Sequence, residues 1–187
     1  MLNPSLEAYI AHVAAGSRTP LRRRIPADLE TPVSAFLKLK PLGAAFLLES
    51  VERGIQMGRY SFIGIAPSAQ IRLRDETLHI VRRGRATTAP LDPADPFAAV
   101  RAELQAAGDL VGERLPGPFA GAVGYLSYDL VRYFERVPAP RPAGLDLPDY
   151  CFYFPEALAV FDHVKSEIEF LVLPSTGDPQ DAYAAAS

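Results

Sequence analysis

The stretch that decides the fold runs from residue 69 to residue 82 and reads Ala-Gln-Ile-Arg-Leu-Arg-Asp-Glu-Thr-Leu-His-Ile-Val-Arg. Apolar and polar side chains alternate before and after Asp75-Glu76, which is the pattern of two β-strands joined by a turn. Alternation places Ile71 and Leu73 on one face and the arginines that follow them on the other. The stretch therefore predicts a β-hairpin with one apolar and one polar face.

Further strands and helices lie on both sides of this hairpin. Two-residue periodicity predicts strands at residues 45–51, 59–65, 151–161 and 167–173, with residues 66–68 as a loop. Helical spacing occurs at residues 4–15 and 31–41, where Ser5 and Thr31 are suitable N-caps, and again after Pro96. This order predicts an α+β fold, in which an antiparallel or mixed β-sheet carries helices packed on one side.

Composition excludes several classes of protein. With 49% apolar and 22% charged residues the chain is globular, and 19 Lys+Arg against 22 Asp+Glu disfavours a domain devoted to nucleic acid. One cysteine among 187 residues excludes a disulfide framework and a multi-cysteine zinc site. The sequence contains neither an apolar run long enough to span a membrane nor a secretory signal, so we expect a cytoplasmic protein.

Most chemistry-bearing residues favour structural interpretations. His12, His79 and His163 lie in different elements and predict no metal site. Cys151 falls in an apolar strand, where cysteine is usually a small hydrophobe. The hairpin arginines could bind phosphates, but a solvated strand face is the favoured interpretation. Gly121-Ala-Val-Gly124 lacks the third glycine of a dinucleotide fingerprint and indicates close backbone packing instead.

One segment combines charge, hydroxyls and apolar side chains at two predicted strand ends. An apolar strand ends in Leu48-Glu49-Ser50, and the next strand begins with Arg59-Tyr-Ser61. Glu49 could meet an ammonium group and Ser50 could hydrogen-bond it, while apolar neighbours receive a side chain, which suits a zwitterionic ligand. Taken alone, the same residues favour an ordinary strand-end salt bridge.

Four motifs occur in an order that resembles a known family. They are residues 31–39 (TPVSAFLKL), 46–50 (FLLES), 58–64 (GRYSFIG) and 121–129 (GAVGYLSYD). Together they closely resemble the N-terminal region of anthranilate synthase component I, one of the chorismate-using enzymes. The resemblance covers roughly residues 6–173, and the 31–39 string is more similar to the anthranilate branch than to para-aminobenzoate synthase component I.

The resemblance implies a chain that is part of an enzyme. Members of the family convert chorismate and ammonia to anthranilate and pyruvate with Mg²⁺, the first committed step of L-tryptophan biosynthesis, and a glutamine amidotransferase subunit supplies the ammonia. Their catalytic and metal residues belong to a C-terminal portion that residues 1–187 do not match. We therefore expect one N-terminal domain of a larger two-part lyase. Alone it should be inactive, and it should be prone to self-association through residues 119–128 and 151–161.

The resemblance also implies a regulatory role. It assigns part of an L-tryptophan feedback site to Ser50 and Glu49, with Leu48 on its wall, and it extends less directly to Arg59 and Ser61. With the surrounding motifs, a ligand role for Glu49-Ser50 becomes the favoured interpretation. Two alternatives stay open: the corresponding domain of para-aminobenzoate synthase, and a non-enzymatic ligand-binding or scaffold module.

Overall fold

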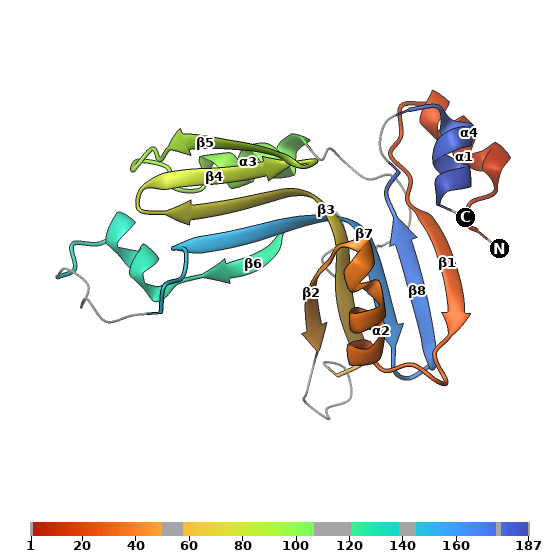
Figure 1. The fold of residues 1–187 in the computed structure, drawn as a ribbon. Helices are drawn as coiled ribbons and strands as arrows, with labels where there is room; N and C mark the ends of the chain where they lie inside the picture. The colour runs from red at the N-terminus through yellow and green to blue at the C-terminus, as the bar shows by residue number, and fades with distance from the viewer. Residues whose placement is uncertain (1, 50–57, 107–120, 139–144, 175–176, 187) are drawn as a thin grey trace. The chain divides into compact units, whose positions relative to one another are not determined.

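The computed structural model describes residues 2–49, 58–106, 121–138, 145–174 and 177–186. Its helices and strands follow the order expected for an α+β chain (Figure 1). They are α1 (Leu6–Ala14), β1 (Leu21–Pro26), α2 (Pro32–Leu39), η1 (Lys40–Leu42), β2 (Ala44–Glu49), β3 (Tyr60–Arg74), β4 (Thr77–Arg82), β5 (Arg85–Pro90), α3 (Ala98–Ala106), β6 (Val123–Leu126), η2 (Tyr128–Tyr133), β7 (Tyr150–Asp162), β8 (Glu167–Val172) and α4 (Pro179–Ala185).

The strands form an eight-stranded sheet in the order β1-β8-β7-β3-β4-β5, with β2 beside β3 and β6 beside β7. Every strand pair whose register the structure describes is antiparallel. Antiparallel pairing with separate helices is the α+β class, so this prediction is confirmed.

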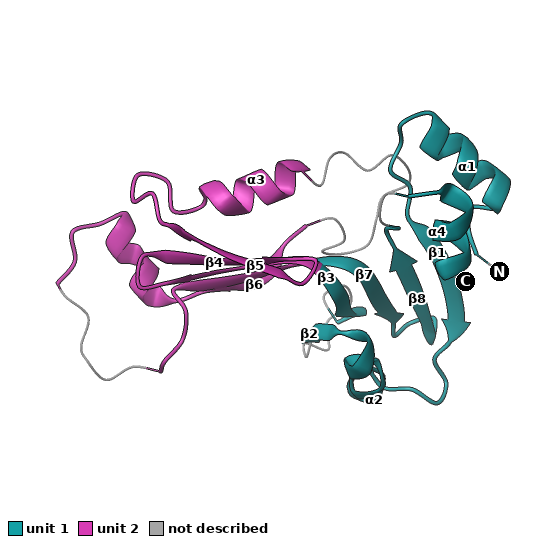
Figure 2. Ribbon diagram, turned by 45° about the horizontal axis from the view of Figure 1, so that its top comes forward, with its two compact units in different colours: residues 1–67, 108–120, 155–187 teal, residues 68–107, 121–154 magenta. Residues whose placement is uncertain are grey.

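The chain divides into two compact units (Figure 2). Unit 1 comprises residues 1–67, 108–120 and 155–187, and unit 2 comprises residues 68–107 and 121–154. The long strands β3 and β7 each contribute residues to both units. Each unit has its own apolar core, so each is described separately below.

Unit 1 uses both faces of its part of the sheet. On one face Ile63, Phe161 and Ile168 pack with Ala35 of helix α2. On the other face Leu158, Val160 and Leu171 are buried, with further aromatic side chains from β2 and β3 packed against them. Successive residues of a strand point to opposite faces, so one strand supplies both clusters.

Two helix starts in unit 1 confirm the N-caps expected from sequence. The Ser5 side chain accepts a hydrogen bond from the N–H of Ala8 at the start of α1. Thr31 and Ser34 form a reciprocal capping box at the start of α2, where Pro32 occupies the first turn. These contacts satisfy N–H groups that have no partner inside the helix, so the helices begin where the sequence predicts.

Unit 2 confirms the hairpin that the sequence predicted. Strands β3 and β4 pair from Ala69↔Arg82 to Arg74↔Thr77. The intervening Asp75 and Glu76 have φ of 48° and 57°, the left-handed conformation that a two-residue hairpin turn requires. The apolar face is buried in a core that also takes in Val100 of α3, Tyr150 and Phe154 of β7, and Leu130 of η2.

One expectation about strands was wrong, and one strand was not predicted. Residues 66–68, expected as a loop, lie inside the continuous strand β3, where Ala66 has φ of 45° and the Ser68 hydroxyl donates to the Phe154 carbonyl at 3.2 Å. The sequence Ala-Pro-Ser interrupts the apolar alternation without ending the strand. Strand β5 was not expected at all, because its side chains are polar and mostly exposed, as an edge strand allows.

Candidate functional site

The ends of β2 and β3 carry the residues predicted to bind a ligand. Glu49 lies directly opposite Ser61, and Leu48 lies directly opposite Phe62. Residues opposite each other share a face, so Glu49 and Ser61 lie on the face of Ile63 while Leu48 lies on the other face. The strand pleat therefore divides the expected cluster between two faces.

Two of these side chains are accessible. Glu49 is exposed at the end of β2, and Leu48 is 41% exposed. Ser50 lies outside the described residues, so its predicted role remains a prediction. An exposed carboxylate and an exposed aliphatic side chain at one strand end are compatible with the ligand role, but each faces its own side of the sheet.

Arg59 forms a strand-end salt bridge with Asp162, the last residue of β7. Its Nη2 donates to Oδ2 at 2.6 Å, and its Nε lies 3.1 and 3.2 Å from the two carboxylate oxygens. Its guanidinium also lies 4.9 Å from the centre of the Tyr60 ring. A salt bridge thus exists at this strand end, but its acid is Asp162, 103 positions away in the sequence, which the sequence analysis did not indicate.

The Ser61 side chain contacts His163, the residue that follows Asp162. The side chain of Ser61 is almost fully buried, at 1% exposure, and its Oγ lies 2.8 Å from Nε2 of His163. The backbone N–H of His163 donates to the Arg59 carbonyl at 2.9 Å. The His163 ring also stacks on Phe161, with 6.2 Å between ring centres. This exposed histidine therefore has a structural partner on β3.

We call Arg59, Ser61, Asp162 and His163 the β3–β7 clasp. Sequence reasoning missed Asp162 and His163 because nothing local to them marks a partner more than a hundred residues away. Besides binding Arg59, the Asp162 carboxylate accepts N–H groups of the β7–β8 turn at 3.1 and 3.2 Å. The one signal available was an aspartate at a strand end before a turn, a position where such capping is common.

The charges of the clasp stabilise each other. The hydrogen bond from Arg59 lowers the pKa of Asp162, partial desolvation opposes this, and the turn N–H groups lower the pKa further. The same carboxylate raises the pKa of Arg59. Both groups are therefore charged across the physiological range.

The lowered pKa of Asp162 predicts an acid-dependent contribution to stability. A carboxylate with a depressed folded-state pKa stabilises the protein above its unfolded pKa, and this contribution is lost as the pH falls through the folded value. Replacing Asp162 by Asn should lower the free energy of unfolding by a constant amount above about pH 5, and the difference should shrink below about pH 4. Urea unfolding of both full-length proteins between pH 3 and pH 7 measures this; a pH-independent difference would contradict it.

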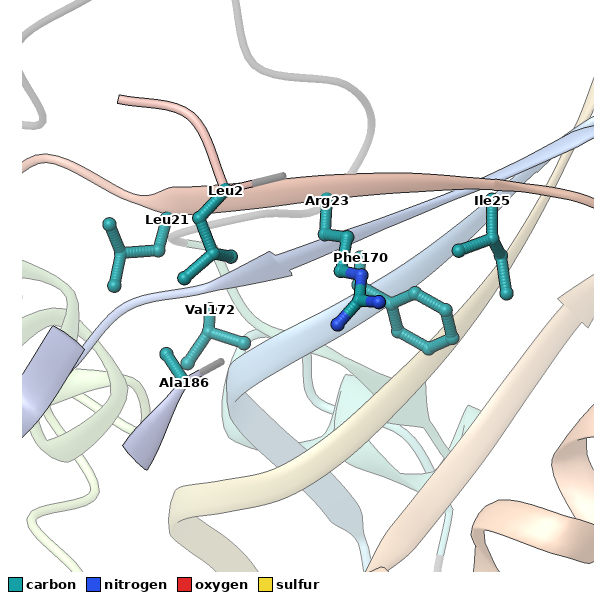
Figure 3. Close-up of a pocket in the computed structure, with 7 residues that line it drawn as sticks. All are labelled: Leu2, Leu21, Arg23, Ile25, Phe170, Val172 and Ala186. Carbon is teal, nitrogen blue, oxygen red and sulfur yellow. The ribbon is translucent and has the colours of Figure 1, made fainter. Parts of the chain in front are cut away.

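Unit 1 also contains grooves, one away from the clasp and one beside it. A groove of about 390 Å³ between β1 and β8 is lined mostly by apolar side chains such as Leu21 and Phe170, with one guanidinium, that of Arg23 (Figure 3). None of the predicted site residues lines it. A smaller groove of about 190 Å³, lined by charged side chains, includes Tyr60 and Asp162 and so adjoins the clasp.

The described residues offer neither a cluster of metal-ligating side chains nor a membrane-spanning helix. Among the residues that the structure describes, no group of three or more His, Cys, Asp or Glu side chains could hold a metal ion. No helix in the described part of the chain is long and apolar enough to cross a membrane.

Comparison with known proteins decides the family. The family model for chorismate binding enzymes matches residues 43–186. The chain belongs to the chorismate-binding enzyme family. Within this family it is 44% identical over 166 residues to anthranilate synthase component 1 of Thermus thermophilus, covering 88% of this chain and 34% of that protein. It is 36% identical over 182 residues to the Pseudomonas aeruginosa protein of the same name, covering 95% and 36%.

A solved structure supports the fold. Anthranilate synthase component I from Streptococcus pneumoniae matches with a TM-score of 0.53 and 22% identity, over 87% of this chain and 34% of that one. The chain thus spans about a third of the length of the relatives it matches. The resemblance to the N-terminal region of anthranilate synthase component I, which the four motifs indicated, is confirmed for this chorismate-binding family member.

Proposed function

We propose that the chain is the N-terminal part of the large subunit of an anthranilate synthase, which converts chorismate and ammonia to anthranilate and pyruvate. The observation that carries this proposal is the 44% identity to a protein of that name over 88% of the chain. Other relatives carry the same name at 32–36% identity. Nothing in the described residues favours the para-aminobenzoate branch or a non-enzymatic module.

The proposal also covers the C-terminal portion of the large subunit and the amidotransferase subunit. The C-terminal portion binds chorismate and Mg²⁺, and a glutamine amidotransferase subunit supplies ammonia. The proposal assigns no residue of this chain to catalysis. This chain instead contributes part of the L-tryptophan feedback site, through Glu49, Ser50 and Leu48.

The exposed carboxylate of Glu49 supports the regulatory part of the proposal. An exposed carboxylate at a strand end can pair with the ammonium group of an amino acid. Arg59 and Ser61, the weaker candidates for the same site, already donate or accept hydrogen bonds within the clasp. Tryptophan inhibits only if it binds one conformation of the enzyme better than the other, so these residues need not touch the substrate.

An assay of product identity tests the activity. The full-length protein should convert chorismate and ammonium salts to anthranilate in the presence of Mg²⁺, detected by fluorescence and confirmed by chromatography against the ortho and para aminobenzoates. Formation of the para-substituted product instead would transfer the chain to the other branch. Absence of any product from a folded full-length protein would contradict the proposal.

The chain on its own should be inactive. Residues 1–187 with chorismate, ammonium and Mg²⁺ should give no anthranilate fluorescence above a blank, because they match only 34–36% of the length of relatives named anthranilate synthase component 1. The matched control is the full-length protein at the same molar concentration in the same buffer. Anthranilate formed by the short chain would show that catalytic residues lie within it.

A further inference from the structure

We propose that the β3–β7 clasp positions the tryptophan site: Asp162 and His163 hold Arg59 and Ser61 so that β3 stays in register opposite Glu49. This inference rests on the proposed feedback function and adds residues that the sequence motifs did not indicate. Asp162 and His163 are positioning residues, which act on the ligand through β3 and β2.

Glu49 lies in the outermost described pair of the β2–β3 ladder. Among the described residues β2 pairs with β3 alone, and Glu49↔Ser61 is the last pair of that ladder that the structure describes. Ends of singly paired strands open most easily, because few contacts hold them. The position of the Glu49 carboxylate therefore depends on how firmly the beginning of β3 is held.

The clasp holds the beginning of β3 from both faces. Arg59 and Asp162 join on the side of Tyr60, where the guanidinium lies 4.9 Å from the ring centre. Ser61 and His163 join on the opposite side, where His163 stacks on Phe161. A backbone hydrogen bond of 2.9 Å from His163 to the Arg59 carbonyl links the two contacts.

The geometry also argues against direct ligand contact by the β3 residues. Ser61 is 1% exposed, and its Oγ already lies within hydrogen-bond distance of His163. Arg59 is bound by both carboxylate oxygens of Asp162. Both side chains are therefore committed to holding the strand.

Replacing Asp162 by Asn in the full-length enzyme tests the inference. The concentration of L-tryptophan for half inhibition should rise about tenfold, a change within the usual range for residues that modulate coupling between sites. Turnover without tryptophan should change by a smaller factor than inhibition does. Ser61→Ala, which removes the other side-chain contact without adding bulk, should raise the half-inhibitory concentration in the same direction.

Glu169→Gln is the matched control. The Glu169 side chain is 15% exposed, against 14% for Asp162, and it binds Arg22 and Arg24 at 3.2 and 3.0 Å. It thus joins β8 to β1 and makes no described contact with β3. Its loss should lower the melting temperature comparably and leave the half-inhibitory concentration within about twofold of wild type.

A double-mutant cycle separates positioning from direct contact. If Arg59 acts only through Asp162, Arg59→Gln, Asp162→Asn and the double variant should all weaken inhibition by a similar factor. If Arg59 contacted tryptophan directly, Asp162→Asn would leave inhibition unchanged or strengthen it. That result, or equal inhibition in Asp162→Asn and Glu169→Gln, would overturn the inference.

The inhibition data also distinguish failure of the proposed function from failure of this inference. A wild-type enzyme that tryptophan does not inhibit would overturn both the regulatory assignment and this inference. A wild-type enzyme that is inhibited, and is desensitised by a change at Ser50 but not at Asp162 or Ser61, would overturn the inference alone.

Discussion

Ser50→Phe in the full-length enzyme is expected to abolish tryptophan inhibition and to leave turnover largely intact. The hydroxyl oxygen of Ser50 is proposed to accept a hydrogen bond from the ammonium group of the ligand. The preceding residue, Glu49, offers its exposed carboxylate to the same group. Losing a hydrogen bond to a charged group costs about 1.5–3 kcal/mol, or roughly ten- to a hundredfold in affinity. The phenyl ring should add a steric term, so this is the largest regulatory effect we expect.

Thr88→Phe is the control for this variant. Thr88 is an exposed hydroxyl-bearing residue on the edge strand β5 of unit 2, so it tests the effect of an added phenyl ring alone. Ser68, which the sequence analysis placed in a loop, is unsuitable as this control. Its hydroxyl donates to the Phe154 carbonyl, and the residue lies inside β3. The measurement is the half-inhibitory tryptophan concentration and the turnover of all three proteins. Wild-type inhibition in Ser50→Phe would make Ser50 structural, and loss of turnover together with inhibition would contradict an allosteric site.

Local patterns predicted the elements that local physics determines. The β3–β4 hairpin, the Ser5 and Thr31 caps and the strands β7 and β8 follow from periodicity and capping chemistry that act over a few residues. The four short motifs, taken together, also indicated the family that the family model matches. These features need no knowledge of distant contacts.

Features set by distant contacts could not be predicted in this way. Glu49 and Leu48 were expected in one cluster, although alternation within β2 alone sends them to opposite faces. Only the register with β3 shows that Glu49 lies opposite Ser61 and Leu48 opposite Phe62. The partners of Arg59 and Ser61 lie more than a hundred residues away, so only the assembled sheet reveals the clasp. Strand β5 forms because β4 offers it hydrogen bonds, although its own side chains show no apolar alternation.

Gly124→Ala is expected to destabilise unit 2 strongly. A Cβ at Gly124 would lie 1.9 Å from the carbonyl oxygen of Cys151 and 2.9 Å from the Cα of Phe152, which are backbone atoms that cannot rotate away. This agrees with the close backbone packing predicted from the glycine-rich segment. Because β6 pairs with β7 through these residues, relief requires the strands to separate. We expect the free energy of unfolding to fall by about 3 kcal/mol, at the upper end for overpacking.

Alanine substitutions at two other glycines serve as comparisons for Gly124→Ala. At Gly64 an added Cβ would meet only the outer ring atoms of Phe46, a side chain that can turn away, so Gly64→Ala should cost less. At Gly177 nothing lies within 4 Å, so Gly177→Ala should be close to neutral. Denaturant unfolding of the three full-length variants gives the order, and hydrogen exchange of the β6 amides shows whether the strand separates. Equal stability of Gly124→Ala and Gly177→Ala would contradict the β6–β7 packing, because no rearrangement of side chains alone can accommodate the new methyl group.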